Sequence, residues 1–245
     1  MISALRRRLR SSKLFSFNAL NRDDWVREQA TKLPAGNLVL DVGAGSCPYR
    51  KLFEHCQYKT QDFEQLQPDQ LRHGGYGQID YVCDAANIPV DADTFDAVLC
   101  TEMLEHVAEP VKVLNELGRV LKPGGKLFLT APLGSGLHQE PHHYYGGYTP
   151  YWYQRFLPEA GFQDIRITAN GKFFLLFSQE SIRFLRMSVP TRMPESFWMK
   201  LLWAPLWLLL LPILGLVIPL ISVVLDKSDR SGQFTVGYHV TAVKE

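Results

Sequence analysis

Leu38-Val39-Leu40-Asp41-Val42-Gly43-Ala44-Gly45 carries the first indication of the fold. Its apolar run has the length of a strand buried on both faces, and it ends at an acidic residue followed by a Gly-x-Gly turn. Glycine allows positive φ and lets a ligand lie against the main chain. A helix expected over residues 49–55 would direct its free N–H groups into the same crevice. We therefore predict a nucleotide-type pocket at the carboxyl end of a parallel strand. The pocket residues expected here are Asp41, Gly43, Ala44 and Gly45.

The spacing of the turn separates two classes of cofactor. A dinucleotide-binding turn has Gly-x-Gly-x-x-Gly/Ala, and its sixth position is Pro48 here, so NAD is a poor fit. The string from Asp41 to Gly45 instead resembles the first motif of class I S-adenosylmethionine (SAM) methyltransferases, whose glycines flank the methionine part of SAM. Cys47 stands where many members have a third glycine, and the stretch from Ser46 to Arg50 resembles the type 11-like branch of that family.

Length, charge and cysteine content narrow the class of protein. A chain of 245 residues suits one α/β domain with an appendage. The net charge of +1 gives no overall basic field, so nucleic acid is not an expected partner. The four cysteines have no C-x-x-C spacing, which argues against structural zinc and a disulfide framework and favours reduced thiols in a cytosolic compartment.

Residues 1–22 form a basic N-terminal arm with no acidic residue before Asp23. They lack an apolar core of signal-peptide length, so secretion is not predicted. Leucines and phenylalanines between the basic residues suit an arm that lies on an anionic membrane surface. The alternative is a loose solvated arm. The basic residues between Met1 and Asn21 are Arg6, Arg7, Arg8, Arg10 and Lys13.

Two further strands are expected to end at acidic residues. A second strand near residues 57–63 should end at Asp62, where a carboxylate can accept both ribose hydroxyls of an adenosine. The methyltransferase family has an acidic residue with that role at this point; Glu64 is the competing position, and an ordinary solvated carboxylate is the third reading. A third strand over residues 79–83 ends at Asp84, and this resembles the family's second motif. The resemblance implies that the Asp84 carboxylate takes the adenine amino group and that the Ala85 N–H meets the ring.

The middle of the chain continues the same pattern. A fourth buried strand, Phe95–Cys100, is followed by Thr101 and Glu102, which lie beside the cofactor in this family. A helix from Pro110 stops at Leu121-Lys122-Pro123-Gly124-Gly125 before a fifth strand over residues 126–130. That stop sequence before a strand is typical of the methyltransferase family.

A His/Tyr-rich loop over residues 137–149 should cover the methyl group, before a helix from Pro150 to Gly161. Methyl transfer from a sulfonium depends on positioning, and an acceptor hydroxyl or amine gains from a base near pH 7. The catalytic candidates are His142 and His143 as bases and Tyr144 as a pocket residue, with His106 as a weaker third base. A purely structural lid is the alternative. Chelation by His138, Glu140, His142 and His143 is an unspecific loop pattern, so no metal is expected.

The segment between the expected sixth strand (162–168) and seventh strand (234–243) is unusually long and apolar. Residues 201–225 carry no charge and, at about 1.5 Å per residue, are long enough to cross a bilayer core of about 30 Å. The last strand must return to the sheet, and prolines at 205, 212 and 219 bend the helix. We therefore expect a monotopic or re-entrant element broken into shorter helices. The alternatives are a cover for the domain's own surface or a dimer interface. The basic residues expected at the headgroups are Arg183, Arg186, Arg192, Lys200, Lys227 and Arg230.

Taken together, these features predict an α/β, Rossmann-like seven-stranded sheet of the class I methyltransferase type, with a hydrophobic helical insert before the last strand. The expected organisation is a basic arm (1–22), a SAM-binding core (23–172), a membrane-associating insert (173–232) and a final core strand (233–245). The expected activity is methyl transfer to a small or lipid-linked acceptor at the cytoplasmic face of a membrane. Two alternatives stay open: a methyltransferase on a soluble glycan or metabolite, and a non-catalytic SAM-binding membrane scaffold. The oligomeric state is left undetermined.

Overall fold

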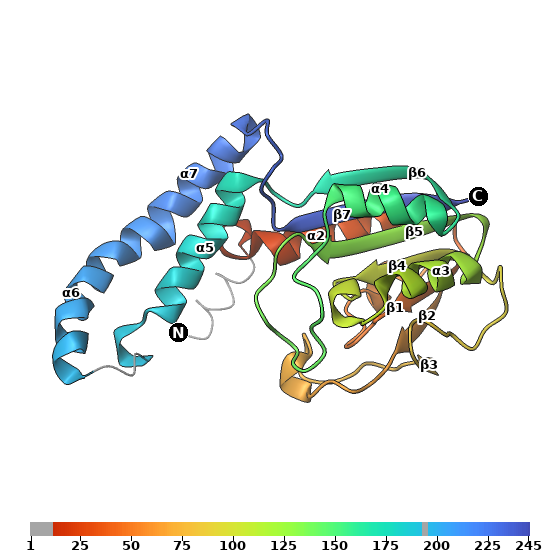
Figure 1. Cartoon of the computed structure of the whole chain (residues 1–245), viewed down its shortest axis with the longest axis horizontal. Helices are drawn as coiled ribbons and strands as arrows, with labels where there is room; N and C mark the ends of the chain where they lie inside the picture. Colours follow the sequence, from red (N-terminus) through yellow and green to blue (C-terminus); the bar gives the residue numbers. More distant parts are fainter. Residues whose placement is uncertain (1–11, 193–195) are drawn as a thin grey trace. The chain divides into compact units, whose positions relative to one another are not determined.

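The computed structural model describes every residue except 1–11 and 193–195 (Figure 1). The chain divides into two compact units. One unit, the sheet unit, combines residues 22–168 with residues 237–245. The other, the helical unit, contains residues 169–236 and the described part of the first 21 residues. Arg6, Arg7, Arg8 and Arg10 of the predicted basic arm lie outside the described residues.

The sheet unit contains the predicted seven-stranded sheet, in the order β3-β2-β1-β4-β5-β7-β6. The first five strands in this order pair in parallel, and β7 is antiparallel to β5. Strand order reverses between β1 and β4, the position where ligands bind in open α/β sheets. The strands are β1 (Leu38–Val42), β2 (Gln57–Asp62), β3 (Tyr81–Val82), β4 (Phe95–Thr101), β5 (Leu121–Pro132), β6 (Phe162–Ala169) and β7 (Gly237–Lys244).

Helices cover the sheet, as Figure 1 shows for α2 (Lys13–Thr31), α3 (Pro110–Val120) and α4 (Pro150–Glu159). The apolar face of α3 is buried through Val113 and its neighbours one turn on. The predicted cap of α4 is confirmed, because Thr149 Oγ1 accepts the Trp152 N–H at 3.3 Å.

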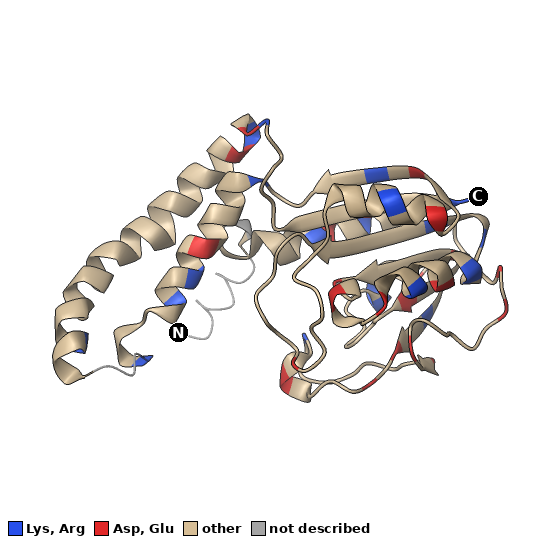
Figure 2. Cartoon of the chain, in the orientation of Figure 1, with Lys and Arg blue, Asp and Glu red and all other residues tan. Residues whose placement is uncertain are grey.

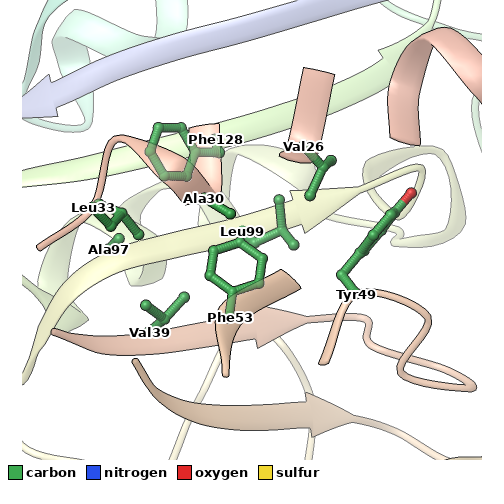
Figure 3. Packing of buried hydrophobic residues seen from close by; sticks show 9 residues of the cluster. All are labelled: Val26, Ala30, Leu33, Val39, Tyr49, Phe53, Ala97, Leu99 and Phe128. Carbon is green, nitrogen blue, oxygen red and sulfur yellow. The ribbon is translucent and has the colours of Figure 1, made fainter. Parts of the chain in front are cut away.

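The core on one face of the sheet is a cluster in which α2 packs against the central strands (Figure 3). Its side chains are at most 4% exposed, so the central strands are held rigidly below the edge that carries the candidate site. The cluster contains Val26, Ala30, Leu33, Val39, Tyr49, Phe53, Ala97, Leu99 and Phe128.

Three predicted elements of the sheet unit differ from the structure. The helix expected over residues 49–55 is a single 3-10 turn, Arg50–Phe53, because the chain must enter β2 at Gln57. It is too short to present a row of free N–H groups to the crevice. The third strand pairs over two residues at the sheet edge, and β5 begins at Leu121, which already pairs with Phe95.

The helical unit is an antiparallel hairpin. Its first helix is α5 (Phe173–Met187), followed by a 3-10 turn, Pro190–Arg192. The return helix runs through α6 (Phe197–Pro212), a π-helical segment (Ile213–Val217) and α7 (Ile218–Leu225). Figure 2 shows that this return helix carries charge only near its ends. A last 3-10 turn, Asp226–Ser228, leads back toward β7.

The expectation of several short helices was wrong, because the chain stays helical through Pro205, Pro212 and Pro219. The π-helical segment absorbs the change of register after Pro212. A helix can pass through proline when other groups satisfy the freed carbonyls.

Candidate active site

A cavity of about 680 Å³ lies at the carboxyl ends of β1, β2 and β4. Eleven of the twelve predicted site residues line it, and His143 does not. The eleven are Asp41, Gly43, Ala44, Gly45, Asp62, Asp84, Ala85, Thr101, Glu102, His142 and Tyr144.

The glycine turn has the backbone that the sequence predicts. Gly43 and Gly45 both have positive φ, at +70° and +52°. The Gly43 N–H bonds to the Gln61 carbonyl oxygen at 2.9 Å, which joins the turn to β2. A Cβ at residue 43 would lie 2.4 Å from Met103 Cγ, so only glycine fits there without moving the wall of the cavity.

Asp62 closes the turn from the end of β2. Its two carboxylate oxygens accept the N–H groups of Gly45 at 2.8 Å and Glu64 at 3.1 Å. The residue is 4% exposed and lines the cavity, whereas Glu64 is exposed and does not. The geometry therefore favours Asp62 over Glu64 as the acidic residue that faces a ligand.

Asp41 is a buried carboxyl group at the base of the cavity. Burial raises its pKa to about 7, with a further contribution from the charge of Asp62, while a hydrogen bond donated by the Tyr58 hydroxyl acts in the opposite direction. Its second oxygen has no hydrogen-bond partner among the described residues. This acid sits where a cationic ligand group would favour its ionised form.

Asp84 and Ala85 line the cavity after the two-residue strand β3. Asp84 is exposed, and its Oδ1 accepts the Ala86 N–H at 2.9 Å, which fixes the direction of the carboxylate. Val82 forms the neighbouring wall and is 58% exposed. An exposed apolar side chain beside a fixed carboxylate suits a flat ring with an amino group.

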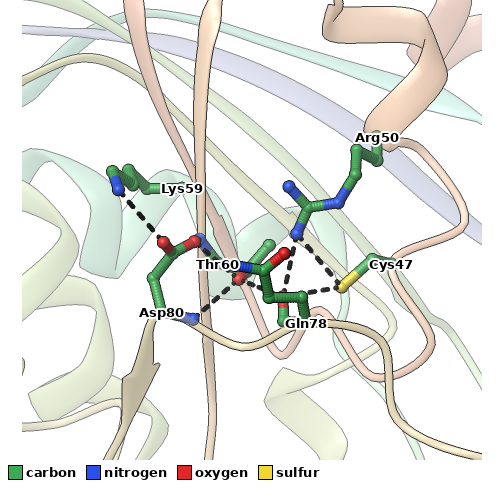
Figure 4. A network of polar contacts seen from close by, with 6 residues as sticks. All are labelled: Cys47, Arg50, Lys59, Thr60, Gln78 and Asp80. Atoms are coloured by element: carbon green, nitrogen blue, oxygen red, sulfur yellow. Dashed lines mark hydrogen bonds and ion pairs between the residues drawn. The ribbon is translucent and has the colours of Figure 1, made fainter.

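A polar network ties the loop before β3 to the glycine turn (Figure 4). The Gln78 carbonyl oxygen accepts bonds from Arg50 at 2.8 Å and from Thr60 at 2.8 Å. The thiol of Cys47 lies 3.5 Å from the same oxygen. Asp80 accepts from the Thr60 N–H and pairs with Lys59, both at 3.0 Å. The network holds the loop over the turn, a role that sequence reasoning missed.

The end of β4 contributes Glu102 in a left-handed conformation, with φ of +49°. One of its oxygens accepts the Thr130 hydroxyl at 2.8 Å, and the other lies 3.2 Å from Arg22. Arg22 also lines the cavity. No sequence pattern identifies Arg22, because it comes from α2 and meets Glu102 only through the fold.

The predicted base candidates take different positions. His142 lines the cavity, with its ring 5.0 Å from the Phe63 ring in an edge-to-face arrangement. His143 lies within hydrogen-bond distance of the Ser135 hydroxyl, at 3.1 Å. His106 lines the cavity, and its pKa is lowered to about 4 by burial and by the neighbouring His138 and His143. His142 is therefore the best placed of the two predicted histidine bases.

Residues 40–129 match a family model described as a methyltransferase domain. A demethylmenaquinone methyltransferase from Clavibacter sepedonicus is 36% identical over 100 residues, which cover 39% of this chain and 41% of the relative. A ubiquinone biosynthesis O-methyltransferase from Xanthomonas oryzae pv. oryzae is 36% identical over 104 residues, covering 39% of this chain and 43% of the relative. The chain thus spans about two fifths of the length of these curated relatives.

Solved structures share the fold. A SAM-dependent methyltransferase from Archaeoglobus fulgidus superposes with a TM-score of 0.53 at 15% identity, covering 99% of both chains. Phosphoethanolamine N-methyltransferase 2 from Haemonchus contortus, solved in complex with S-adenosyl-L-methionine, has a TM-score of 0.52 at 17% identity. That match covers 92% of this chain and 52% of the other. At these identities the likeness establishes a Rossmann-like methyltransferase fold.

Proposed function

We propose that this chain is an enzyme that transfers the methyl group of SAM to a small-molecule acceptor, and the match of residues 40–129 to a methyltransferase domain together with the shared fold supports this proposal. The observation that carries the proposal is the cavity at the β1/β4 reversal, where the glycine turn, Asp62 and Asp84 converge. The turn would receive the methionine part of SAM. Asp62 would accept the ribose hydroxyls, and Asp84 with Ala85 would bind the adenine.

The reaction is an in-line displacement at the methyl carbon. A lone pair of the acceptor forms the new bond as the C–S bond breaks, and the electron pair of that bond goes to sulfur. We assign His142 as the group that takes the proton of the acceptor, since its side chain reaches the cavity from the loop. Tyr144 would exclude water beside it, which favours positioning and a defined methyl path.

Calorimetric titration with SAM tests the cofactor assignment. We expect micromolar binding by the parent and at least about a tenfold loss in Asp84→Ala, since one charge-assisted hydrogen bond contributes about 1.5–3 kcal/mol. Asp91→Ala is the matched control, because Asp91 is exposed and does not line the cavity. A folded parent that gives no heat with SAM would overturn the proposal and leave the non-catalytic membrane scaffold, without SAM, as the better reading.

We further propose that the helical unit attaches the enzyme to a membrane and that the acceptor is a hydrophobic or lipid-linked molecule. One helix, Phe197–Ser228, is long and apolar enough to cross a bilayer, and 11% of its most apolar window is buried. Its exposed apolar side chains run along its whole length. They include Trp198, Leu202, Leu208, Leu209, Leu216, Leu220 and Val224. Both ends of the insert connect to strands of one sheet, which favours a hairpin that enters one leaflet over a single crossing.

Several polar groups of the hairpin are paired within it, as an apolar solvent requires. The indole N–H of Trp203 donates to the carbonyl of Ser188, directly after α5, at 2.7 Å, and that of Trp207 donates to the Leu185 carbonyl in the last turn of α5 at 3.2 Å. In the π register the Leu214 carbonyl would pair with the N–H of residue 219, which is proline. The Ser181 hydroxyl donates to that carbonyl instead, at 2.9 Å. Asp226 accepts N–H groups at the start of α5.

Flotation with vesicles of phosphatidylcholine and phosphatidylglycerol (7:3) tests the attachment. We expect the parent to float and the Leu208→Glu/Leu209→Glu variant to stay in the soluble fraction. Leu137→Glu is the matched control, since Leu137 is 78% exposed but belongs to the sheet unit. If both variants float equally, the exposed face of the long helix is not the membrane contact. A dimer that forms through this face without vesicles would favour the interface alternative.

Labelled SAM distinguishes the acceptor classes. The parent is incubated with membrane extract and, separately, with soluble extract, and the labelled product is partitioned between organic and aqueous phases. Label from membrane extract in the organic phase supports a lipid-linked acceptor. Label confined to the soluble extract and the aqueous phase supports the alternative, a soluble glycan or metabolite.

A further inference from the structure

Three side chains with metal-ligating atoms converge beside the cavity. Glu105 and His106 belong to the 3-10 turn Leu104–His106 after β4, and His138 belongs to the loop after β5. One ligand atom of each lies within 4.8 Å of those of the other two. The spacing of residues in the loop after β5 did not predict this set, because Glu105 and His106 come from the turn after β4.

Both imidazole rings are oriented by backbone carbonyls. His106 Nδ1 lies 2.6 Å from the His142 carbonyl oxygen, and His138 Nδ1 lies 2.8 Å from the Gly136 carbonyl oxygen. A carbonyl only accepts, so each Nδ1 carries a proton, which leaves Nε2 as the atom that can ligate a metal. A ligating histidine in metalloproteins typically has this second-shell bond, which fixes tautomer and ring direction.

Glu105 supplies an unsatisfied buried carboxyl group. It is 1% exposed, and its Oε2 has no hydrogen-bond partner among the residues that the structure describes. Its Oε1 lies 3.7 Å from His106 Nε2. A buried polar atom without a partner is costly, and coordination to a cation removes that cost. The backbone position is fixed, because the Glu105 carbonyl accepts the Tyr144 and Tyr145 N–H groups at 2.9 and 3.2 Å.

We propose that Glu105, His106 and His138 bind a divalent ion of the zinc class at the edge of the cavity. Two imidazole nitrogens and one carboxylate leave a coordination position open, as in catalytic zinc sites. Bonds of about 2.1 Å in a tetrahedral site need ligand atoms about 3.4 Å apart. The Glu105 Oε1 and His106 Nε2 atoms, 3.7 Å apart, are near that separation, and the His138 ligand atom lies within 4.8 Å of those of both residues.

The position of the ion gives it a role in the proposed reaction, and this part of the inference rests on the proposed function. His106 and His142 line the cavity, so the open coordination position borders the acceptor region. An acceptor hydroxyl bound there loses its proton more easily, and the proton passes to His142 or to water. The oxygen then attacks the methyl carbon as the C–S bond breaks and its electron pair moves to sulfur. The acceptor atom assigned by this site is a hydroxyl oxygen.

Cobalt is the spectroscopic probe. Full-length protein without a histidine tag is freed of metal with EDTA and titrated with CoCl2, and the visible d–d absorption is recorded. We expect saturation at one ion per chain and displacement by ZnCl2. His138→Ala and Glu105→Gln should each weaken Co²⁺ binding by at least about 100-fold, since loss of a second-shell group alone costs 10–100-fold. His73→Ala is the matched control, because His73 is exposed and outside the cluster.

Calorimetry with SAM on the same proteins separates the two proposals. His138→Ala should bind SAM like the parent, which verifies its fold and cofactor site. A parent that binds SAM but gives no saturable Co²⁺ absorption overturns the metal site and leaves the proposed function standing. A parent that binds Co²⁺ but gives no heat with SAM overturns the proposed function and leaves the metal site standing. If His143→Ala weakens Co²⁺ binding as much as His138→Ala does, and Glu105→Gln changes nothing, the loop histidines alone hold the ion and this assignment is overturned.

Discussion

Gly77 leaves the space that the Cys47 thiol occupies. A Cβ at residue 77 would lie 2.5 Å from Cys47 Sγ, and the Gly77 N–H donates to the Gly45 carbonyl at 2.9 Å. The loop before β3 therefore packs directly against the glycine turn through Gly77. Cys47, the departure from the third glycine of many family members, is matched by a glycine thirty residues later.

Gly77→Ala should destabilise the protein by about 1–3 kcal/mol, because an overpacked contact forces the loop away from the turn. Urea unfolding measures the loss, and calorimetry with SAM measures the weakened cofactor site. Gly75→Ala is the control, since nothing lies within 4 Å of its Cβ position. The double variant Cys47→Gly/Gly77→Ala should recover most of the stability. No recovery would mean that the thiol is not the obstacle.

Gly43→Ala should abolish detectable SAM binding and lower the free energy of unfolding by about 1–3 kcal/mol. The new methyl group meets Met103, and the residue has positive φ. Gly36→Ala separates the two causes, because Gly36 also has positive φ but open space around its Cβ position. Equal SAM affinity in the two variants would contradict the role assigned to the Gly43 contact.

His142→Ala should lower kcat by about 10²–10⁴-fold with the SAM dissociation constant unchanged, the usual effect of removing a general base. His143→Ala should retain most of the activity, because His143 does not line the cavity. The readouts are product formation under saturating SAM and calorimetry on each variant. The opposite ranking of the two variants would reassign the base. A larger loss in Tyr144→Phe would point to the tyrosine hydroxyl.

His239 predicts a loss of stability in acid. Burial lowers its pKa to about 4, against an unfolded value of about 6.5, so the unfolded chain binds the proton first. Stability from this group is full above pH 6.5 and is lost as the pH falls toward 4. His239→Phe keeps the ring that stacks on Trp25 at 4.9 Å. The free energy of unfolding of the variant should rise relative to that of the parent as the pH falls, by at most about 3 kcal/mol near pH 4. A constant difference in unfolding free energy from pH 7 to 4 would contradict this.

The local elements were predictable because their signals are local. The buried strand at Val39 and Leu40, the Gly43–Gly45 turn and the Thr149 cap each depend on a few neighbouring residues. The length of the helix predicted after Tyr49 was overestimated, because the short distance to β2 leaves room for only one 3-10 turn. It also predicted broken helices in the apolar insert, where the Ser181 hydroxyl compensates for a carbonyl that Pro219 cannot satisfy.

The order of motifs along the chain determined the sheet, the cavity at the β1/β4 reversal and most of its lining, because strand ends in a parallel sheet meet at one edge whatever the loops do. The meeting of residues far apart in the chain depended on tertiary structure. Arg22 reaches Glu102, Gly77 accommodates Cys47, and His138 approaches Glu105 and His106. The physical reason is that each pairing needs a defined separation of two side chains, and only the packed core and the fixed loops set that separation.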